Sequence, residues 1–222
     1  MRHTWIGVAM LVALSVARPT HAAASAGWTN GGMLGADTGG FYGLLGFPGM
    51  SVGYLRGVSE SLDVGGRFSF NYGGEGVPSL NLGVGFKVAG DVKLKLDPGL
   101  PFGAFTLRAL PGIHVLFPPG FTFFNLALPV ELALGVPIAP NLLVHVSVEA
   151  PLAIGLWTGF GVSPTVAQVP VLFGGGGEFK VDRALSLHAQ LHIGPYVQII
   201  FGGATTTYFA FDSLLGITYR LP

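Results

Sequence analysis

The sequence has no cysteine, few charged residues and, beyond its beginning, no long apolar run. Without cysteine there are no disulfides, so an exported chain of this kind needs another constraint, such as a closed hydrogen-bonded sheet. Charged residues make up 10% of the chain and hydrophobic residues 50%, which is typical of a protein that faces lipid. A membrane-spanning helix needs about 20 apolar residues, and the 36 glycines and 16 prolines interrupt the apolar runs. A closed β-barrel is the remaining structure that spans a bilayer.

The first 26 residues have the character of a secretory signal peptide. A basic start precedes an apolar core over Thr4–Ala17 and a small, polar tail over Arg18–Ala26. A core of about 14 residues is short for a membrane span. We therefore predict cleavage after Ala22 or Ala26, with a retained anchor as the alternative, and one domain over residues 27–222.

Removal of this segment changes the charge balance, because it takes away Arg2 and Arg18 and no acid. The whole chain has 11 Lys+Arg and 11 Asp+Glu, so residues 27–222 carry 9 basic against 11 acidic side chains. A net charge of about −2 argues against nucleic acid or another polyanion as a partner.

The clearest strand pattern runs from Leu80 to Leu96. Its even-numbered residues are apolar except Gly90, and its odd-numbered residues are polar or small. Side chains alternate between the two faces of a strand, so this pattern describes a strand between an oily and an aqueous medium. The alternation recurs along the chain and predicts an all-β fold, a single antiparallel transmembrane β-barrel.

Nine strands follow from this pattern, the first at Met50–Gly57. Bacterial membrane barrels have an even number of strands, so a weaker strand within Gly31–Leu45 is expected to complete ten, with eight as the alternative. The other strands are expected at Leu62–Tyr72, Leu80–Leu96, Phe102–Phe117, Phe124–Ile138, Leu142–Leu156, Gln168–Val181, Leu185–Ile199 and Tyr208–Leu221. Short connections such as Asp97–Gly99 and Ala139–Asn141 are placed at the periplasmic end.

The alternation directs most charged side chains into the barrel. The inward set is Asp63, Arg67, Lys87, Asp91, Lys93, Lys95, Arg108, Glu131, Glu149, Glu178, Lys180, Asp212 and Arg220. A turn at Ala139–Asn141 places Glu131 opposite Glu149, and the preceding hairpin places Arg108 opposite Glu131.

A tight turn at Asp97–Gly99 would also bring Lys87 within reach of Arg108. We therefore expect Lys87, Arg108, Glu131 and Glu149 to form a lumen charge network at one level, since adjacent carboxylates repel unless cations neutralise them. We favour ion pairs that fill a lumen about as wide as a side chain. A selectivity constriction or a proton-linked site is the alternative.

No group of residues points clearly to a catalytic, cofactor or metal site. His188 and His192 face inward on one strand, but four residues of strand separate their Cα atoms by about 13 Å, too far for one metal ion. His145 is assigned with them to the polar lumen, and no Ser/His/Asp spacing stands out. The run Gly174–Gly177 lies within a strand and leaves room for bulky lumen neighbours or permits a bend.

Two segments add information beyond the alternation. The chain end, Gly216–Leu221, looks like a barrel-assembly signal of the form Gly-x-x-hydrophobic-x-hydrophobic. The segment Tyr54–Gly65 is similar to the Arg-Tyr-Gly-x-Ser/Thr-Asp/Glu-x-Leu-Asp-x-Gly hairpin of many such barrels. On these residues the chain resembles small Gram-negative outer-membrane β-barrel proteins. The resemblance implies a place in the cell outer membrane, contact with its lipids and with the barrel-assembly machinery, and an assembly signal at Gly216, Tyr219 and Leu221.

These observations support a hypothesis of function at the level of class. The favoured class is an outer-membrane barrel with a mostly packed polar lumen, which is not an enzyme and has a structural role or a surface role. An extracellular ligand, if there is one, would bind through the loops. The alternative is a porin-like pore for small solutes, because inward glycines at Gly83, Gly85, Gly174 and Gly176 leave space. A barrel enzyme is the least favoured class.

Overall fold

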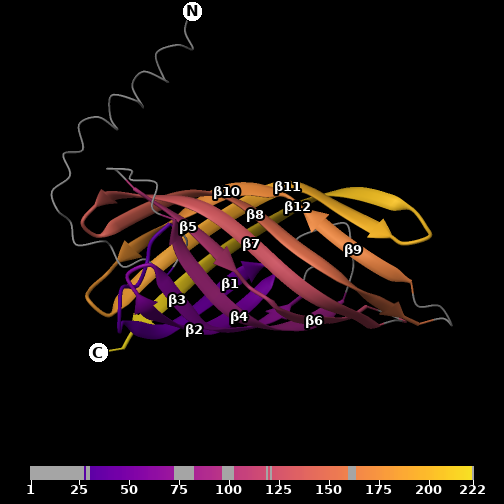
Figure 1. Cartoon of the computed structure of the whole chain (residues 1–222), viewed down its shortest axis with the longest axis horizontal. Coiled ribbons are helices and arrows are strands. Elements are labelled where there is room, and N and C mark those ends of the chain that lie inside the picture. Colours follow the sequence, from indigo (N-terminus) through magenta and orange to yellow (C-terminus); the bar gives the residue numbers. More distant parts are fainter. Residues whose placement is uncertain are drawn as a thin grey trace, which may run out of the picture.

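The computed structural model describes residues 28, 31–72, 83–96, 103–118, 120, 122–159 and 164–221. These residues form an all-β structure, a closed antiparallel barrel (Figure 1). The expected signal peptide and the expected turn at Asp97–Gly99 lie outside the described residues. Within these ranges, no helix has the length and apolar character needed to cross a membrane.

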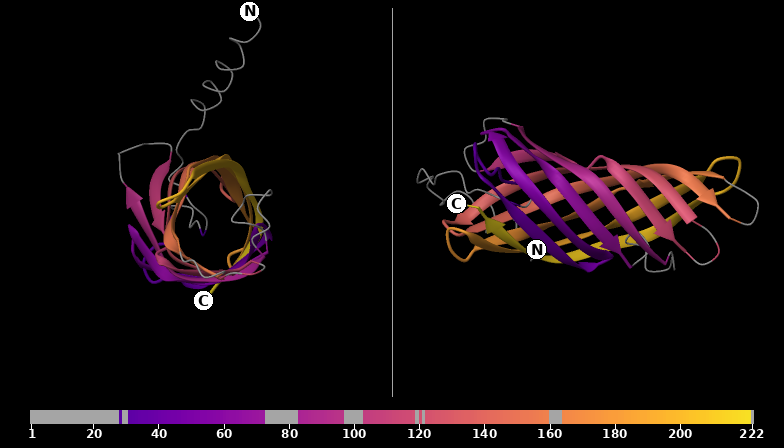
Figure 2. Two further views of the ribbon diagram at one scale, coloured as in Figure 1. Left: turned by 90° about the vertical axis from the view of Figure 1, so that its right-hand side faces the viewer. Right: turned by 90° about the horizontal axis from the view of Figure 1, so that it is seen from below.

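The barrel is built from strands that follow one another around the wall. In chain order they are β1 (Gly39–Phe47), β2 (Gly49–Ser59), β3 (Leu62–Asn71), β4 (Val84–Leu96), β5 (Ala104–Ala109), β6 (Gly112–Phe117), β7 (Thr122–Ala139), β8 (Leu142–Thr158), β9 (Thr165–Pro170), β10 (Leu172–Lys180), β11 (Leu185–Ile200) and β12 (Thr205–Arg220). β5 and β6 both pair with β4 and β7, and β9 and β10 both pair with β8 and β11. The barrel therefore has ten strand positions, as predicted, and β1 pairs with β12 to close it (Figure 2).

Two strand positions are interrupted next to a proline, which has no backbone N–H for the ladder, although other prolines, such as Pro129 and Pro151, lie within continuous strands. β5 and β6 meet at Pro111, and β9 and β10 meet at Pro170. Neighbouring backbone groups still bond across both interruptions. The N–H of Gly90 donates to the carbonyl of Pro111 at 2.9 Å, and that of Val171 donates to the carbonyl of Pro195 at 3.0 Å. Each interrupted pair therefore acts as one strand of the wall.

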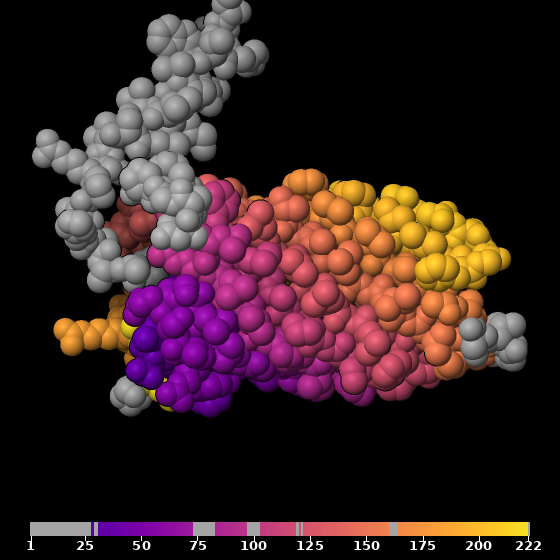
Figure 3. Space-filling view, viewed as in Figure 1, coloured from indigo at the N-terminus to yellow at the C-terminus, as the bar shows by residue number. Residues whose placement is uncertain are grey.

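The two faces of the wall differ as the alternation predicts. Apolar side chains cover the outside, among them Phe41, Leu45, Val52, Val88, Leu126, Leu132, Val146, Phe173, Leu191, Phe209, Leu215 and Ile217. Figure 3 shows one side of this outer surface. Polar and charged side chains are buried inside, among them Asp63, Asp91, Lys93, Arg108, Glu131, Glu178 and His192. Lys95, which was expected inside, is exposed near the end of β4.

Part of the chain before β1, Trp28 and Gly31–Leu34, lies inside the barrel. Trp28 and Gly31–Leu34 are buried at the end of the barrel where the chain terminates, here called the C-terminal end; the opposite end is the loop end. The N–H of Trp28 donates to Glu178 at 2.9 Å, and that of Gly31 donates to the Thr106 hydroxyl at 2.8 Å. The expected strand within Gly31–Leu45 thus begins only at Gly39, because the residues before it bond to lumen side chains instead.

Asp63 joins this N-terminal segment to the barrel wall. Its carboxylate accepts a hydrogen bond from the N–H of Leu34 at 3.2 Å and lies 3.1 Å from Nζ of Lys93. Both charged side chains have no exposed surface. Trp28 and Leu34 also pack in one apolar cluster with Tyr42 and other lumen residues of the wall. The segment is therefore held by backbone donors, a buried ion pair and apolar contacts together.

Replacement of Lys93 tests this arrangement. Lys93→Met leaves the Asp63 carboxylate buried without its cation, so we expect the free energy of unfolding to fall by roughly 3–5 kcal/mol. The matched control is Arg56→Met, which removes an exposed ion pair with Asp37 and should cost less than about 1 kcal/mol. Urea unfolding of both variants in detergent measures the difference, and equal losses would contradict the buried pair.

Candidate functional site

The strand register brings together three of the residues expected in the lumen charge network. Arg108 lies opposite Glu131 across β5 and β7, and Glu131 lies opposite Glu149 across β7 and β8. The second pairing arises from a connection of two residues, Pro140 and Asn141, together with a register shift at Ile138. The observed turn is one residue shorter than the expected turn at Ala139–Asn141, and the extra residue at the bulge, Ile138, compensates for this difference. The register of β7 and β8 is therefore the one that the three-residue turn predicts.

Lys87 occupies a different level. It lies opposite His114 on β6, and Lys93 is the residue of β4 opposite Arg108. The expected register between Lys87 and Arg108 is therefore wrong by six residues. The reason is the length of the connection, because β4 continues to Leu96 and β5 begins only at Ala104.

The ion-pair partner of Arg108 in the lumen is Asp91. Nε of Arg108 donates to Oδ1 of Asp91 at 2.8 Å, and the Tyr42 hydroxyl donates to Oδ2 of the same carboxylate at 2.7 Å. The guanidinium carbon lies 5.5 Å from the centre of the Tyr42 ring. Asp91 was predicted to face inward, but its pairing with Arg108 depends on the β4–β5 register that the sequence did not provide.

A second group of side chains surrounds His192, and we call it the His192 cluster: Ser147, His192, Asp212, Glu131 and Glu149. Nε2 of His192 lies 2.7 Å from the Ser147 hydroxyl and 3.6 Å from Glu131. Nδ1 lies 3.1 Å from Asp212 and 3.8 Å from Glu149. One imidazole, itself fully buried, therefore has carboxylates on both sides of its ring.

Four strands place Ser147, His192 and Asp212 in one row, and Glu131 and Glu149 form a pair two residues along β7 and β8. His192 lies directly opposite Asp212 on β12, while Gly174 of β10 lies between His192 and Ser147. A Cβ atom at Gly174 would overlap the His192 ring and the carbonyl of Leu191. The glycine therefore leaves the space through which His192 and Ser147 meet, which agrees with the interpretation of the run Gly174–Gly177 as room for lumen neighbours.

The contacts of Ser147, His192 and Asp212 follow the order of a hydrolytic triad, which the sequence did not suggest. His192 is 45 residues from Ser147 and 20 from Asp212, and only the register brings them together. Acyl transfer also requires donors for an oxyanion. The backbone at Ser147 pairs with β7 on one side and β10 on the other, so its N–H groups serve the sheet. The contacts therefore hold the His192 imidazole in place, but the backbone at Ser147 offers no free donor for the oxyanion that a nucleophilic serine requires.

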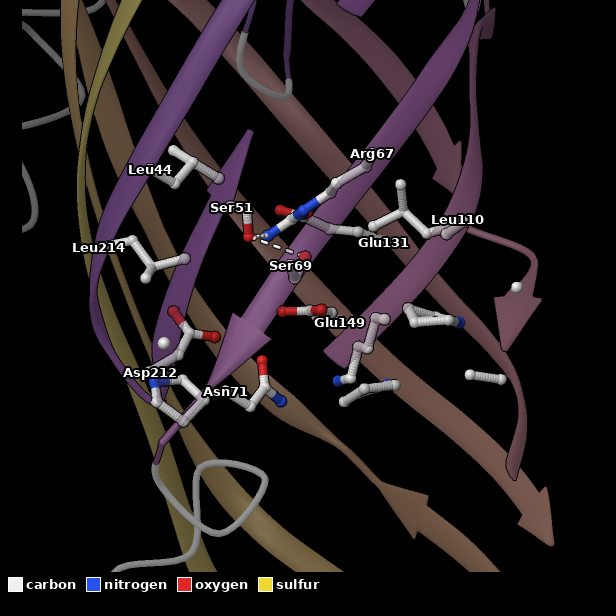
Figure 4. Close-up of a pocket in the computed structure, with 18 of the residues that line it drawn as sticks. Leu44, Ser51, Arg67, Ser69, Asn71, Leu110, Glu131, Glu149, Asp212 and Leu214 are labelled. Carbon is white, nitrogen blue, oxygen red and sulfur yellow. Dashed lines mark hydrogen bonds between the residues drawn. The ribbon is translucent and has the colours of Figure 1, made fainter. Parts of the chain in front are cut away.

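A cavity of about 140 Å³ lies beside the cluster in the lumen (Figure 4). Opposite charges line it from different strands: Arg67, Lys87 and Arg108 from β3, β4 and β5, and Glu131, Glu149 and Asp212 from β7, β8 and β12. Arg67 donates to the Ser51 hydroxyl at 2.8 Å. Apolar side chains such as Leu110 and Leu214 complete the lining, and the volume has room for several water molecules at about 10–15 Å³ each.

The remaining predicted residues lie nearer the C-terminal end. His188 of the lumen packs against Gly216, where a Cβ atom would overlap the imidazole. Tyr219 is exposed on the outer face, and Leu221 follows β12 directly, with its N–H donating to the carbonyl of Gly39 at 2.9 Å. The three residues of the expected assembly signal thus lie at the seam where β12 meets β1 and β11.

Comparison with known proteins adds no family assignment. No protein-family model matches the sequence, and no curated protein is similar to it. The fold and the lumen geometry therefore carry the functional argument.

Two glycines of the same run test how tightly the His192 cluster is packed. Gly174→Ala places a methyl group against the His192 ring and should lower the free energy of unfolding by about 1–3 kcal/mol. Gly177→Ala is the matched control, because its methyl group would meet the nearest atom, the carbonyl oxygen of Leu143, at 3.4 Å. Its effect should stay within about 0.5 kcal/mol. A neutral Gly174→Ala variant in urea unfolding would contradict the close packing.

Proposed function

We propose that this chain is an outer-membrane β-barrel protein whose lumen does not conduct, with a structural role or a surface role through its loops. The barrel fold is compatible with this location. Soluble proteins rarely expose contiguous apolar patches of more than a few hundred Å², whereas this wall is apolar around its circumference. Membrane barrels have that polarity, apolar outside and polar inside. Outer-membrane lipids and the barrel-assembly machinery are the partners that follow from this location.

Exposed and half-buried aromatic side chains near the C-terminal end support the membrane proposal. Phe41, Tyr54 and Tyr219 lie on the neighbouring strands β1, β2 and β12, and the rings of Phe41 and Tyr54 are 5.2 Å apart. Aromatic rings gather at the level of lipid headgroups, where one end of the side chain is apolar and the other is hydrated. This group would mark one interface of the membrane.

The N-terminal segment is the observation that carries the proposal of a closed lumen. Trp28 and Gly31–Leu34 occupy the barrel at its C-terminal end, and the fully buried pair of Lys93 and Asp63 lies beside them. The space that favoured a pore is also filled. A Cβ atom at Gly85 would meet the side chain of Leu116, and one at Gly174 would meet His192.

Electrical measurement separates a closed barrel from a pore. The purified chain, reconstituted in a planar bilayer, should give no regular single-channel steps, because the lumen contents block a water-filled path. Liposome swelling in small solutes should likewise be absent. Reproducible steps or solute-dependent swelling would support the pore instead and overturn the proposal of a closed lumen.

Substitutions at Leu132 test the membrane proposal separately. Leu132 is 42% exposed on the outer face of β7. Leu132→Arg should lower stability in lipid by about 2–4 kcal/mol if this position lies at mid-bilayer. Leu132→Phe keeps an apolar group and should be nearly neutral. Urea unfolding in lipid vesicles measures both, and a damaging Leu132→Phe with a neutral Leu132→Arg would contradict a lipid-facing wall.

A further inference from the structure

We propose that Glu149, His192 and Asp212 bind one divalent transition-metal cation, such as Zn²⁺ or Mn²⁺, inside the lumen. The three residues come from β8, β11 and β12, and each offers a ligand atom within 4.8 Å of the others. This site is additional to the closed-lumen function and depends on neither the membrane location nor the absence of conductance.

The spacing of the ligand atoms suits a metal ion. A tetrahedral site with ligand bonds of about 2.0–2.1 Å separates its ligands by about 3.3 Å. Nδ1 of His192 lies 3.1 Å from Asp212 and 3.8 Å from Glu149, so the observed distances lie on both sides of that value. The third separation, between Glu149 and Asp212, is within 4.8 Å.

The second ring nitrogen of His192 has the contact that a metal-bound histidine needs. Ligating histidines donate the N–H of their other nitrogen to an oxygen, and this bond fixes the tautomer and the orientation of the ring. Nε2 lies 2.7 Å from the Ser147 hydroxyl. With Nε2–H donating to Ser147, Nδ1 presents its lone pair to the space shared with Asp212 and Glu149.

The carboxylates of Glu149 and Asp212 share one close basic neighbour. His192 is the one basic group within 4 Å of Glu149 or Asp212 among the described residues. The nearby guanidinium of Arg108 pairs with Asp91. Arg67, Lys87 and Arg108 also line the cavity, and a bound dication would add a countercharge in direct contact with both buried carboxylates.

A further buried imidazole lies near the cluster, although it does not line the cavity. His145 lies two residues before Ser147 on the inward face of β8 and is 2% exposed. Neither of its ring nitrogens has a hydrogen-bond partner in the structure. Buried polar groups of this kind are normally satisfied by water or an ion.

The cavity gives an ion access to the ligands. Glu149 and Asp212 both line it (Figure 4). Pro48, in the connection between β1 and β2, lines it as well. Water in the cavity can complete the coordination sphere. A nitrogen ligand together with carboxylates favours Zn²⁺, Mn²⁺ or another first-row cation over Ca²⁺ and Mg²⁺, which prefer oxygen alone.

Metal titration of the purified, chelator-treated barrel tests the site. Isothermal titration calorimetry with Zn²⁺ and with Mn²⁺ should show one site per chain. Glu149→Gln, His192→Gln and Asp212→Asn should each abolish that site or weaken it by at least about 10-fold. Asp37→Asn and Glu60→Gln, which change exposed carboxylates, should bind as the unchanged chain does.

Folding controls and a competing interpretation complete the test. Each variant is first checked for the heat-dependent gel shift of a folded barrel. If a variant fails this check, a second experiment replaces it: the unfolding temperature is measured with and without metal for the unchanged chain and for Ser147→Ala. We expect metal to raise the unfolding temperature of the unchanged chain and to raise that of Ser147→Ala by less. Absence of a one-to-one site, binding that the cluster variants leave unchanged, or preference for Ca²⁺ would overturn the proposal. Labelling by a serine-reactive fluorophosphonate that is lost in Ser147→Ala, without metal binding, would overturn it in favour of a nucleophile.

Discussion

Closure of the sheet between β1 and β12 is the constraint on which the rest of the structure depends. Gly40 to Phe47 pair with Ser213 to Arg220, and this seam leaves the ring of strands without a free edge. A closed ring satisfies the backbone groups within the wall. Once the wall is closed, each side chain can point only outward or into the lumen, so the apolar outside and the polar inside follow from the period of the strand.

The narrow interior explains why its contents are so closely connected. For about ten strands the space inside is comparable to the side chains that fill it. Charged groups in that space have little access to bulk water, and they are stable only with partners. Asp63 is shared by Lys93 and the backbone of Leu34, and Asp91 is shared by Arg108 and Tyr42. The N-terminal segment and the wall thus stabilise each other through the same side chains.

The sequence predicted the strands and their facing well, because the two-residue period is a local property. Register was predictable where a connection was short: the β7–β8 hairpin placed Glu131 opposite Glu149. It failed between β4 and β5, where a longer connection moved Lys87 away from Arg108. The His192 cluster could not be predicted from the sequence, because it requires the registers of four strands and a glycine between the side chains of Ser147 and His192. The lumen position of Gly31–Leu34 has no periodic signal, because its bonds go to side chains distant in the sequence.

The N-terminal segment also constrains the order in which the barrel assembles. Neighbouring strand positions pair with their sequence neighbours, and the β1–β12 seam joins residues far apart in the chain. Local hairpins form faster than contacts between distant residues, so the pairing of β1 with β12 is expected to form last. Trp28 packs against Gly40, one residue into β1, and a Cβ atom at Gly40 would overlap the indole. Because this contact needs both the indole and a paired β1, Trp28 is expected to reach its final packing only when the seam forms.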